Sequence, residues 1–200
     1  MRFLLIIVIV LALLAAYFWY ATLIKRRNRA QEALSSIDVQ LLKRHDLLPN
    51  VLKLANQFMA HERDLLNRLT ELRTAARQTW DPTQADEVKR HLEAEGALQA
   101  QLRRLFAVAE NYPELRSSET IVQAQQSFNE VEGHIAAARR FYNAAVTELN
   151  SAVQIFPGTV IARMAGVQAL PYFELDEPAA RKPVDADQYL HVPGGKGGNE

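Results

Sequence analysis

Residues 121–156, IVQAQQSFNEVEGHIAAARRFYNAAVTELNSAVQIF, decide the fold class of this chain. Large apolar residues recur at every seventh position: Ile121, Phe128, Ile135, Tyr142, Leu149 and Phe156. Small residues dominate the second position of the same heptad: Ala124, Val131, Ala138, Ala145 and Ala152. Steps that alternate between three and four residues are typical of a long helix packing along a left-handed seam. The pattern leaves open whether this chain or a second chain fills the seam.

Three further helical segments precede this one. Residues 25–47, 50–78 and 83–111 are rich in Ala, Leu, Gln, Glu and Arg, with apolar residues at helical spacing. Pro49 is predicted to turn the chain between the first two, and Glu95 interrupts the apolar face of the third. The wide stripe of the second predicts burial against two partners. The fold class is therefore all-α, an antiparallel bundle of about four long helices.

An uncharged run leads into the bundle. Residues 3–24 contain 22 residues without a charge, and only Thr22 lies outside the hydrophobic set. About 20 such residues cross the hydrocarbon core of a bilayer as a helix, and the aromatic residues at 17–20 are typical of the membrane interface. The run is longer than the apolar part of a signal peptide. We therefore expect an N-terminal transmembrane anchor with the lipid bilayer as its partner, continuing without a break toward the bundle.

The charges that flank this run predict its orientation. Lys25, Arg26, Arg27 and Arg29 follow it, whereas Arg2 and the amino terminus precede it. The positive-inside rule then places the N-terminus outside and the C-terminal domain in the cytoplasm.

Three parts of unlike composition follow from this division. Residues 1–24 form the anchor, residues 25–172 the helical bundle and residues 173–200 a flexible tail. Four prolines after residue 170 prevent a long helix there, and glycines dominate the last seven residues.

Composition and spacing exclude several kinds of chemistry. The chain has 23 basic and 23 acidic residues, so nothing favours nucleic acid, and it has no cysteine for disulfides or thiolate metal sites. No histidine follows an acidic residue by three positions, as ferritin-type metal sites require. Glu87 and His91 are interpreted as a solvated surface pair. We expect no catalytic residue, no metal, no cofactor and no enzymatic activity.

Charged and polar residues enter helices that should pack, and five of them are candidate contacts. They are Asp38, Arg44 and Asp46 in the first bundle segment, and Arg139 and Asn143 beside the seam of the last. One interpretation is that Asp–Arg contacts fix the register between these helices. The other is that the five bind a ligand or a partner.

Three ordered motifs in this chain resemble those of the LemA family of bacterial membrane proteins. They are residues 28–50, which contain IDVQL and end in DLLPN, residues 109–115, AENYPEL, and residues 138–143, ARRFYN, followed by FPG at 156–158. The resemblance implies a single-pass anchor in the inner membrane, a short exterior N-terminus and an antiparallel helical bundle. It supplies no reaction.

The leading hypothesis is a membrane-anchored interaction or scaffold protein, with a second copy or another membrane protein as its partner. The alternative is a membrane-tethered bundle that senses a ligand in envelope or stress signalling.

Overall fold

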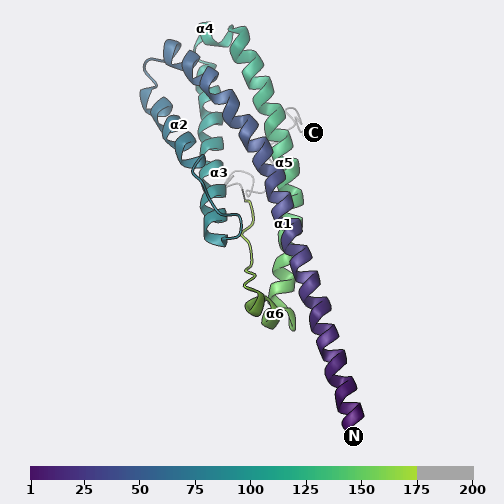
Figure 1. Ribbon diagram of the computed structural model, residues 1–200. Coiled ribbons are helices and arrows are strands. Elements are labelled where there is room, and N and C mark those ends of the chain that lie inside the picture. Colours follow the sequence, from purple (N-terminus) through teal and green to yellow (C-terminus); the bar gives the residue numbers. More distant parts are fainter. Residues whose placement is uncertain (175–200) are drawn as a thin grey trace, which may run out of the picture.

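The computed structural model describes residues 1–174, which are helical over most of their length (Figure 1). The helices are α1 (Arg2–Phe58), α2 (Arg63–Ala76), α3 (Ala85–Ala109), α4 (Pro113–Arg116), α5 (Glu119–Gln154) and α6 (Gly158–Ala165). Residues 1–174 contain no strand. Helices α1, α2, α3 and α5 run alternately up and down the bundle, so the predicted all-α, antiparallel bundle is confirmed.

Helix α1 runs without a break from the apolar end of the chain into the bundle. The predicted turn at Pro49 is wrong, because α1 continues past it to Phe58. A proline inside a helix removes one backbone hydrogen bond. Here Leu48, directly before it, and Val51, two residues after it, are buried in the core. Packing on both sides of the proline outweighs the lost bond and keeps the helix continuous.

The second predicted helix, residues 50–78, is split between α1 and α2. A turn over residues 59–62 separates them. The Met59 side chain is fully buried in this turn, and its N–H donates to the carbonyl of Ala55 at 2.7 Å. The wide apolar stripe therefore belongs to two helices, which pack on each other and on α3 in one cluster.

The heptad seam of α5 is filled within the chain, mainly by α1 (Figure 1). Its buried members are Ile121, Phe128, Val131, Ile135, Tyr142, Ala145, Leu149 and Ala152. Buried residues of α1 repeat at the same spacing: Ala30, Leu34, Ile37, Leu41, Leu48, Val51 and Ala55. Phe156, which the pattern assigns to the seam, lies beyond the end of α5 and is exposed.

Two apolar clusters form the core. The anchor-side cluster combines α6 and the first half of α3 with α1 and α5, and it includes residues after α6 as far as Phe173. The distal cluster combines α2 and the second half of α3 with other parts of α1 and α5. We call residues 167–174 the C-terminal strap. The rest of the predicted tail, residues 175–200, lies outside the described residues.

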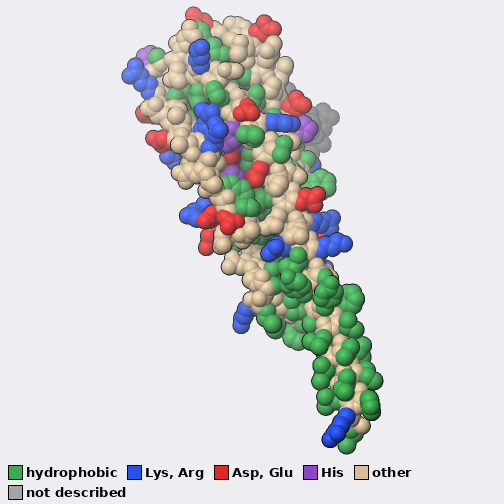
Figure 2. All heavy atoms as spheres, in the orientation of Figure 1, with side chains coloured by type: hydrophobic (Ala, Val, Ile, Leu, Met, Phe, Trp, Pro, Cys, Tyr) green, Lys and Arg blue, Asp and Glu red, His purple; other side chains and the backbone are tan. Residues whose placement is uncertain are grey.

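The N-terminal end of α1 projects beyond the bundle as a rod covered by apolar side chains (Figure 2). Every residue from 1 to 22 is exposed, and burial begins at Leu23. Among residues 1–174, α1 is the one helix long and apolar enough to cross a membrane, and none of its most apolar 18-residue stretch is buried. The predicted anchor is thus a candidate membrane span.

Candidate functional site

A buried polar network joins α1, α3 and α5 between the two apolar clusters. Arg44 pairs with Glu95 and with Glu132, whose Oε1 lies 3.0 Å from Arg44 Nη1. Arg44 Nη2 also donates to the backbone carbonyl of Glu95 at 3.1 Å. His45 Nε2 lies 2.7 Å from Glu95 Oε1, and the Gln99 amide donates to Oε2 of Glu132. We call these five residues the ionic network.

The network residues stand at core positions of otherwise apolar repeats. Arg44 follows the three-and-four spacing of the buried leucines before and after it on α1. On α3 the same spacing leads from Leu92 through Glu95 and Gln99 to Leu102, all of which are buried. Arg44 is one of the five predicted contacts, whereas Glu95 is predicted only to interrupt the apolar face of its helix. The heptad phase of Glu95 is the signal that would have identified it as a core residue.

The surroundings of Glu95 keep it ionised. Burial alone would raise the pKa of this carboxyl, because it removes water from the charged form. His45 and Arg44 each contribute a hydrogen bond and a positive charge, which favour the carboxylate. Together these outweigh burial and hold the pKa of Glu95 below its ordinary value of 4.5. Because the carboxylate is the acceptor, Nε2 of His45 is assigned as the donor.

The network is suited to fixing the register of three helices. One guanidinium bridges two carboxylates from different helices, so sliding any helix past the others separates buried opposite charges.

Within residues 1–174, Arg44 Nε and His45 Nδ1 are buried without a hydrogen-bond partner. The same residues contain no group of three or more His, Cys, Asp or Glu side chains placed to hold a metal ion.

A second polar contact lies where α1 meets α3. Asp38 Oδ1 is 3.4 Å from Nε2 of His91, whose ring stacks on Trp80 with the centroids 4.4 Å apart and the planes 15° apart. The interpretation of Glu87 and His91 as a solvated pair is wrong, because the His91 side chain is only 8% exposed. Glu87 instead accepts the backbone N–H of Asp81 at 2.7 Å. The Trp80 ring covers one face of the imidazole.

Arg139 and Asn143 contact the C-terminal strap. The Asn143 amide makes two hydrogen bonds to the backbone of Phe173, donating to its carbonyl at 3.2 Å and accepting its N–H at 2.9 Å. One heptad later, Asn150 makes the same pair of bonds to Leu170, both at 2.9 Å. The Arg139 guanidinium lies 5.9 Å from the centre of the Phe173 ring. The two asparagines thus hydrogen-bond the backbone of the extended strap, as a neighbouring strand would in a sheet.

Asp46 lies at the surface, where it lines a shallow pocket of about 340 Å³ with Lys43, Ser127 and His134. The five predicted contacts are therefore distributed over the molecule: Arg44 in the ionic network, Asp38 beside His91, Asp46 at the surface, and Arg139 and Asn143 beneath the strap. The structure brings only the last two to the same place, so the five do not form a single ligand site.

An open groove of about 610 Å³ lies between α3 and the C-terminal strap. Gly96, Ala97 and Ala100 form part of its α3 wall, and Tyr172 belongs to the strap side. None of the five predicted contacts lines it. The small side chains on α3 leave this space open.

Comparison with known proteins finds a family and three relatives of this chain. A family model described as the LemA family matches residues 33–187. Magnetosome proteins MamQ 1 and MamQ 2 of Paramagnetospirillum magneticum are each 27% identical over 206 residues, which covers 90% of this chain and 75% of theirs. Magnetosome protein MamQ of Magnetospirillum gryphiswaldense is 26% identical over 209 residues, with 91% and 76% covered. These names refer to the magnetosome and state no reaction.

Proposed function

Since this chain belongs to the LemA family, we propose that it is an interaction or scaffold protein anchored in the inner membrane of a bacterium, and that it binds a partner rather than catalysing a reaction. The observation that carries this proposal is the continuity of α1. Its exposed apolar end leads, with no linker, into a face that is buried in the bundle from Leu23 onward.

The dimensions of α1 suit this role. At 1.5 Å per residue, the 22 uncharged residues span roughly 33 Å, close to the thickness of the hydrocarbon core. The remaining residues, 25–58, extend roughly 50 Å further. A bundle built on this helix holds any bound partner at a set distance from the bilayer.

The proposal places the bundle in the cytoplasm, on the evidence of the basic residues at 25–29. Protease added to inside-out vesicles should digest the bundle, whereas protease added to intact spheroplasts should leave it whole. Digestion in spheroplasts would reverse the orientation and leave the anchoring itself intact.

A partner surface is available on α1 beside the buried seam. Val39 and Leu42 are three residues apart, and each is 55% exposed. A photo-crosslinking amino acid at Val39, activated in intact membranes, should give an adduct of defined mass with a second copy or with another membrane protein. The same probe at Lys53, an exposed polar position of α1, should not. Monomer alone at both positions would argue against the scaffold role.

A ligand-sensing bundle is the second candidate, and the open groove beside the strap favours it. Metabolites that bind there should raise the melting temperature of the wild type. Ala100→Trp, which fills the groove from α3, should abolish that shift, whereas Asp38→Ala should keep it. A shift that persists in Ala100→Trp would exclude the groove as the binding site.

A further inference from the structure

The turn between α5 and α6 presents large apolar side chains to the outside. Phe156 in the turn is 80% exposed and Met164 at the end of α6 is 84% exposed, with Ile155 and Val160 also exposed. Val160 and Met164 are four residues apart and share one face of α6. Ala162, on the opposite face, is buried in the anchor-side cluster. A short surface helix normally turns polar residues outward, so this apolar outer face needs a partner.

The position of the turn along α1 identifies that partner. Arg29 Nη1 lies 3.2 Å from Glu148 of α5, and Arg26 donates to the Glu148 carbonyl at 3.2 Å. From Glu148 to Ile155 the antiparallel α5 descends seven residues, or roughly 10 Å. That descent brings the turn to the level of residues 19–22 of α1. This level lies near the bundle end of the uncharged run and includes two of its aromatic residues.

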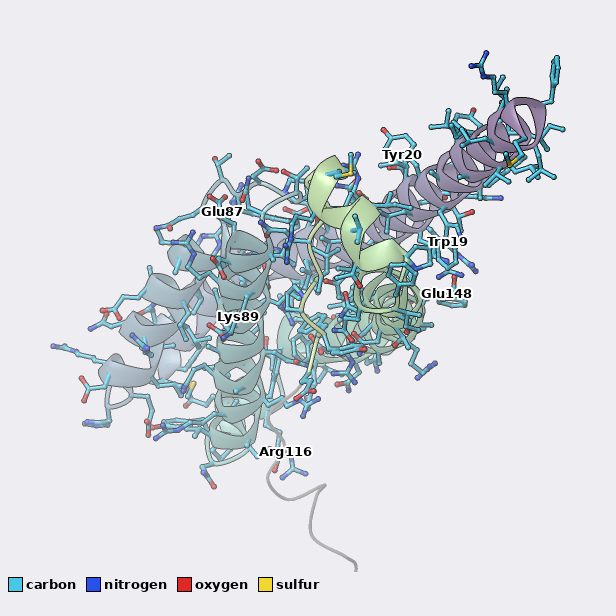
Figure 3. The ribbon with its side chains drawn as sticks, turned by 90° about the horizontal axis from the view of Figure 1, so that it is seen from below. Trp19, Tyr20, Glu87, Lys89, Arg116 and Glu148 are labelled. Atoms are coloured by element: carbon cyan, nitrogen blue, oxygen red, sulfur yellow. The ribbon has the colours of Figure 1, made fainter. Side chains whose placement is uncertain are left out.

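Direct contacts agree with this height. A β-carbon on Gly158, the first residue of α6, would lie 3.8 Å from the Trp19 ring. Figure 3 shows Trp19 and Glu148 on neighbouring parts of α1 and α5, with α6 close by. Leu23 of α1 and Ala162 of α6 belong to the same buried cluster. The exposed apolar face thus stands beside the aromatic residues that are typical of the membrane interface.

We propose that Ile155, Phe156, Val160 and Met164 insert into the interfacial layer of the same bilayer that α1 spans. This rests on the proposed membrane anchoring and adds a second contact with lipid. Aromatic and aliphatic side chains on a short helix enter the boundary between headgroups and acyl chains. Arg163, exposed between Val160 and Met164, reaches the phosphate groups with its long side chain. Two contact points fix the rotation of the bundle about α1.

The absence of cysteine in the chain allows a direct test. Phe156 and Met164 are each replaced by cysteine in separate variants of the protein, and the cysteine is labelled with the fluorophore NBD. Each labelled variant is then reconstituted in vesicles of phosphatidylethanolamine and phosphatidylglycerol. Both labels should lose fluorescence when lipids with a nitroxide near the headgroup are added, and aqueous iodide should quench them weakly. Phe141→Cys is the matched control: Phe141 is an exposed phenylalanine too, but it lies within α5, roughly 20 Å further from the span. Iodide should quench its label strongly.

Leu11→Cys separates this inference from the anchoring on which it rests. Its label should be quenched by a nitroxide deep in the acyl chains. If Leu11 is quenched in that way but Phe156 and Met164 respond to iodide as Phe141 does, the second lipid contact is absent while the anchor stands. If Leu11 itself is reached by iodide, both the anchor and the second contact are overturned.

Discussion

Arg44 is a full charge at a position where the helical repeat otherwise places leucine. It is 1% exposed, and both of its carboxylate partners come from other helices. A buried ion pair contributes little net stability compared with well-packed apolar residues, but removal of one partner leaves the other charge stranded. The residue therefore specifies which helices meet and in which register.

Arg44→Met should lower the free energy of unfolding by about 3–5 kcal/mol, because Glu95 and Glu132 then lose their buried cation. Urea titration of the full-length protein in detergent, followed by circular dichroism, measures this change. Arg68→Met removes an exposed pair with Glu71 and should change stability by no more than about 0.5 kcal/mol. Equal effects of the two substitutions would mean that the network does not organise the core.

The pKa of Glu95 gives the stability a dependence on acid. Because this pKa is lowered in the folded state, the stabilisation by Glu95 is fully present above its ordinary value of 4.5 and is lost as the pH falls through the lower folded value. Melting temperature against pH should therefore fall more steeply below pH 4.5 for the wild type than for Glu95→Gln. Parallel curves for the two proteins would contradict this assignment.

At the scale of elements, α6 and the strap are held by a few close contacts rather than by long seams. The start of α6 approaches the last turns of α5 so closely that a β-carbon on Gly158 would overlap the carbonyl oxygen of Ala152. Residues 1–174 offer the strap no neighbouring strand, and asparagine side chains of α5 bind its backbone instead. Single substitutions should therefore release either element without unfolding the bundle.

Gly158→Ala should destabilise the protein by about 1–3 kcal/mol, because the new methyl group overlaps a backbone atom that cannot rotate away. Gly133→Ala is the matched control, since a β-carbon there meets nothing within 4 Å. Inside α5 it should raise stability by about 0.5–1 kcal/mol. Thermal melts of both variants, followed by circular dichroism, would distinguish the two; opposite signs are expected.

Asn150→Ala should free the strap, because it removes both hydrogen bonds to Leu170. Amide hydrogen exchange should accelerate over residues 167–174 and remain unchanged in the middle of α1. Asn129→Ala, at an exposed position of α5, should leave exchange in the strap as it is in the wild type. Unchanged exchange in Asn150→Ala would show that the two bonds from Asn150 are not needed to hold this segment.

At the scale of the whole molecule, α1 is the element that unites the structure. It contributes to both apolar clusters, carries two residues of the ionic network and includes the candidate membrane span. Helices α3 and α5 also pass through both clusters. Damage at one end of the bundle should therefore be transmitted to the other, and the domain should unfold as one unit.

Ile37→Ala in the anchor-side cluster and Leu69→Ala in the distal cluster test this cooperativity. Both side chains are fully buried, so each change should cost about 2–5 kcal/mol. Helical circular dichroism and tryptophan fluorescence should show one coincident transition in each variant. Two separated transitions in either variant would mean that the clusters unfold independently.

Much of this architecture could be predicted from local patterns. The heptads of residues 121–156 predicted α5 almost to its ends, and the uncharged run predicted the exposed apolar rod. The errors came where long-range contacts decide. Pro49 is tolerated because core residues pack on both sides of it, and Glu95 is buried because Arg44 and His45 from another helix compensate its charge.

The sequence by itself determined the helical class, the apolar rod and the spacing of the core positions, because these follow from the periodicity of neighbouring residues. Only the tertiary structure decided that α1 fills the seam of α5, that one arginine joins three helices, and that the apolar face of α6 lies level with Trp19. The physical reason is that burial and charge pairing depend on residues about fifty to more than a hundred positions apart, which no local period encodes.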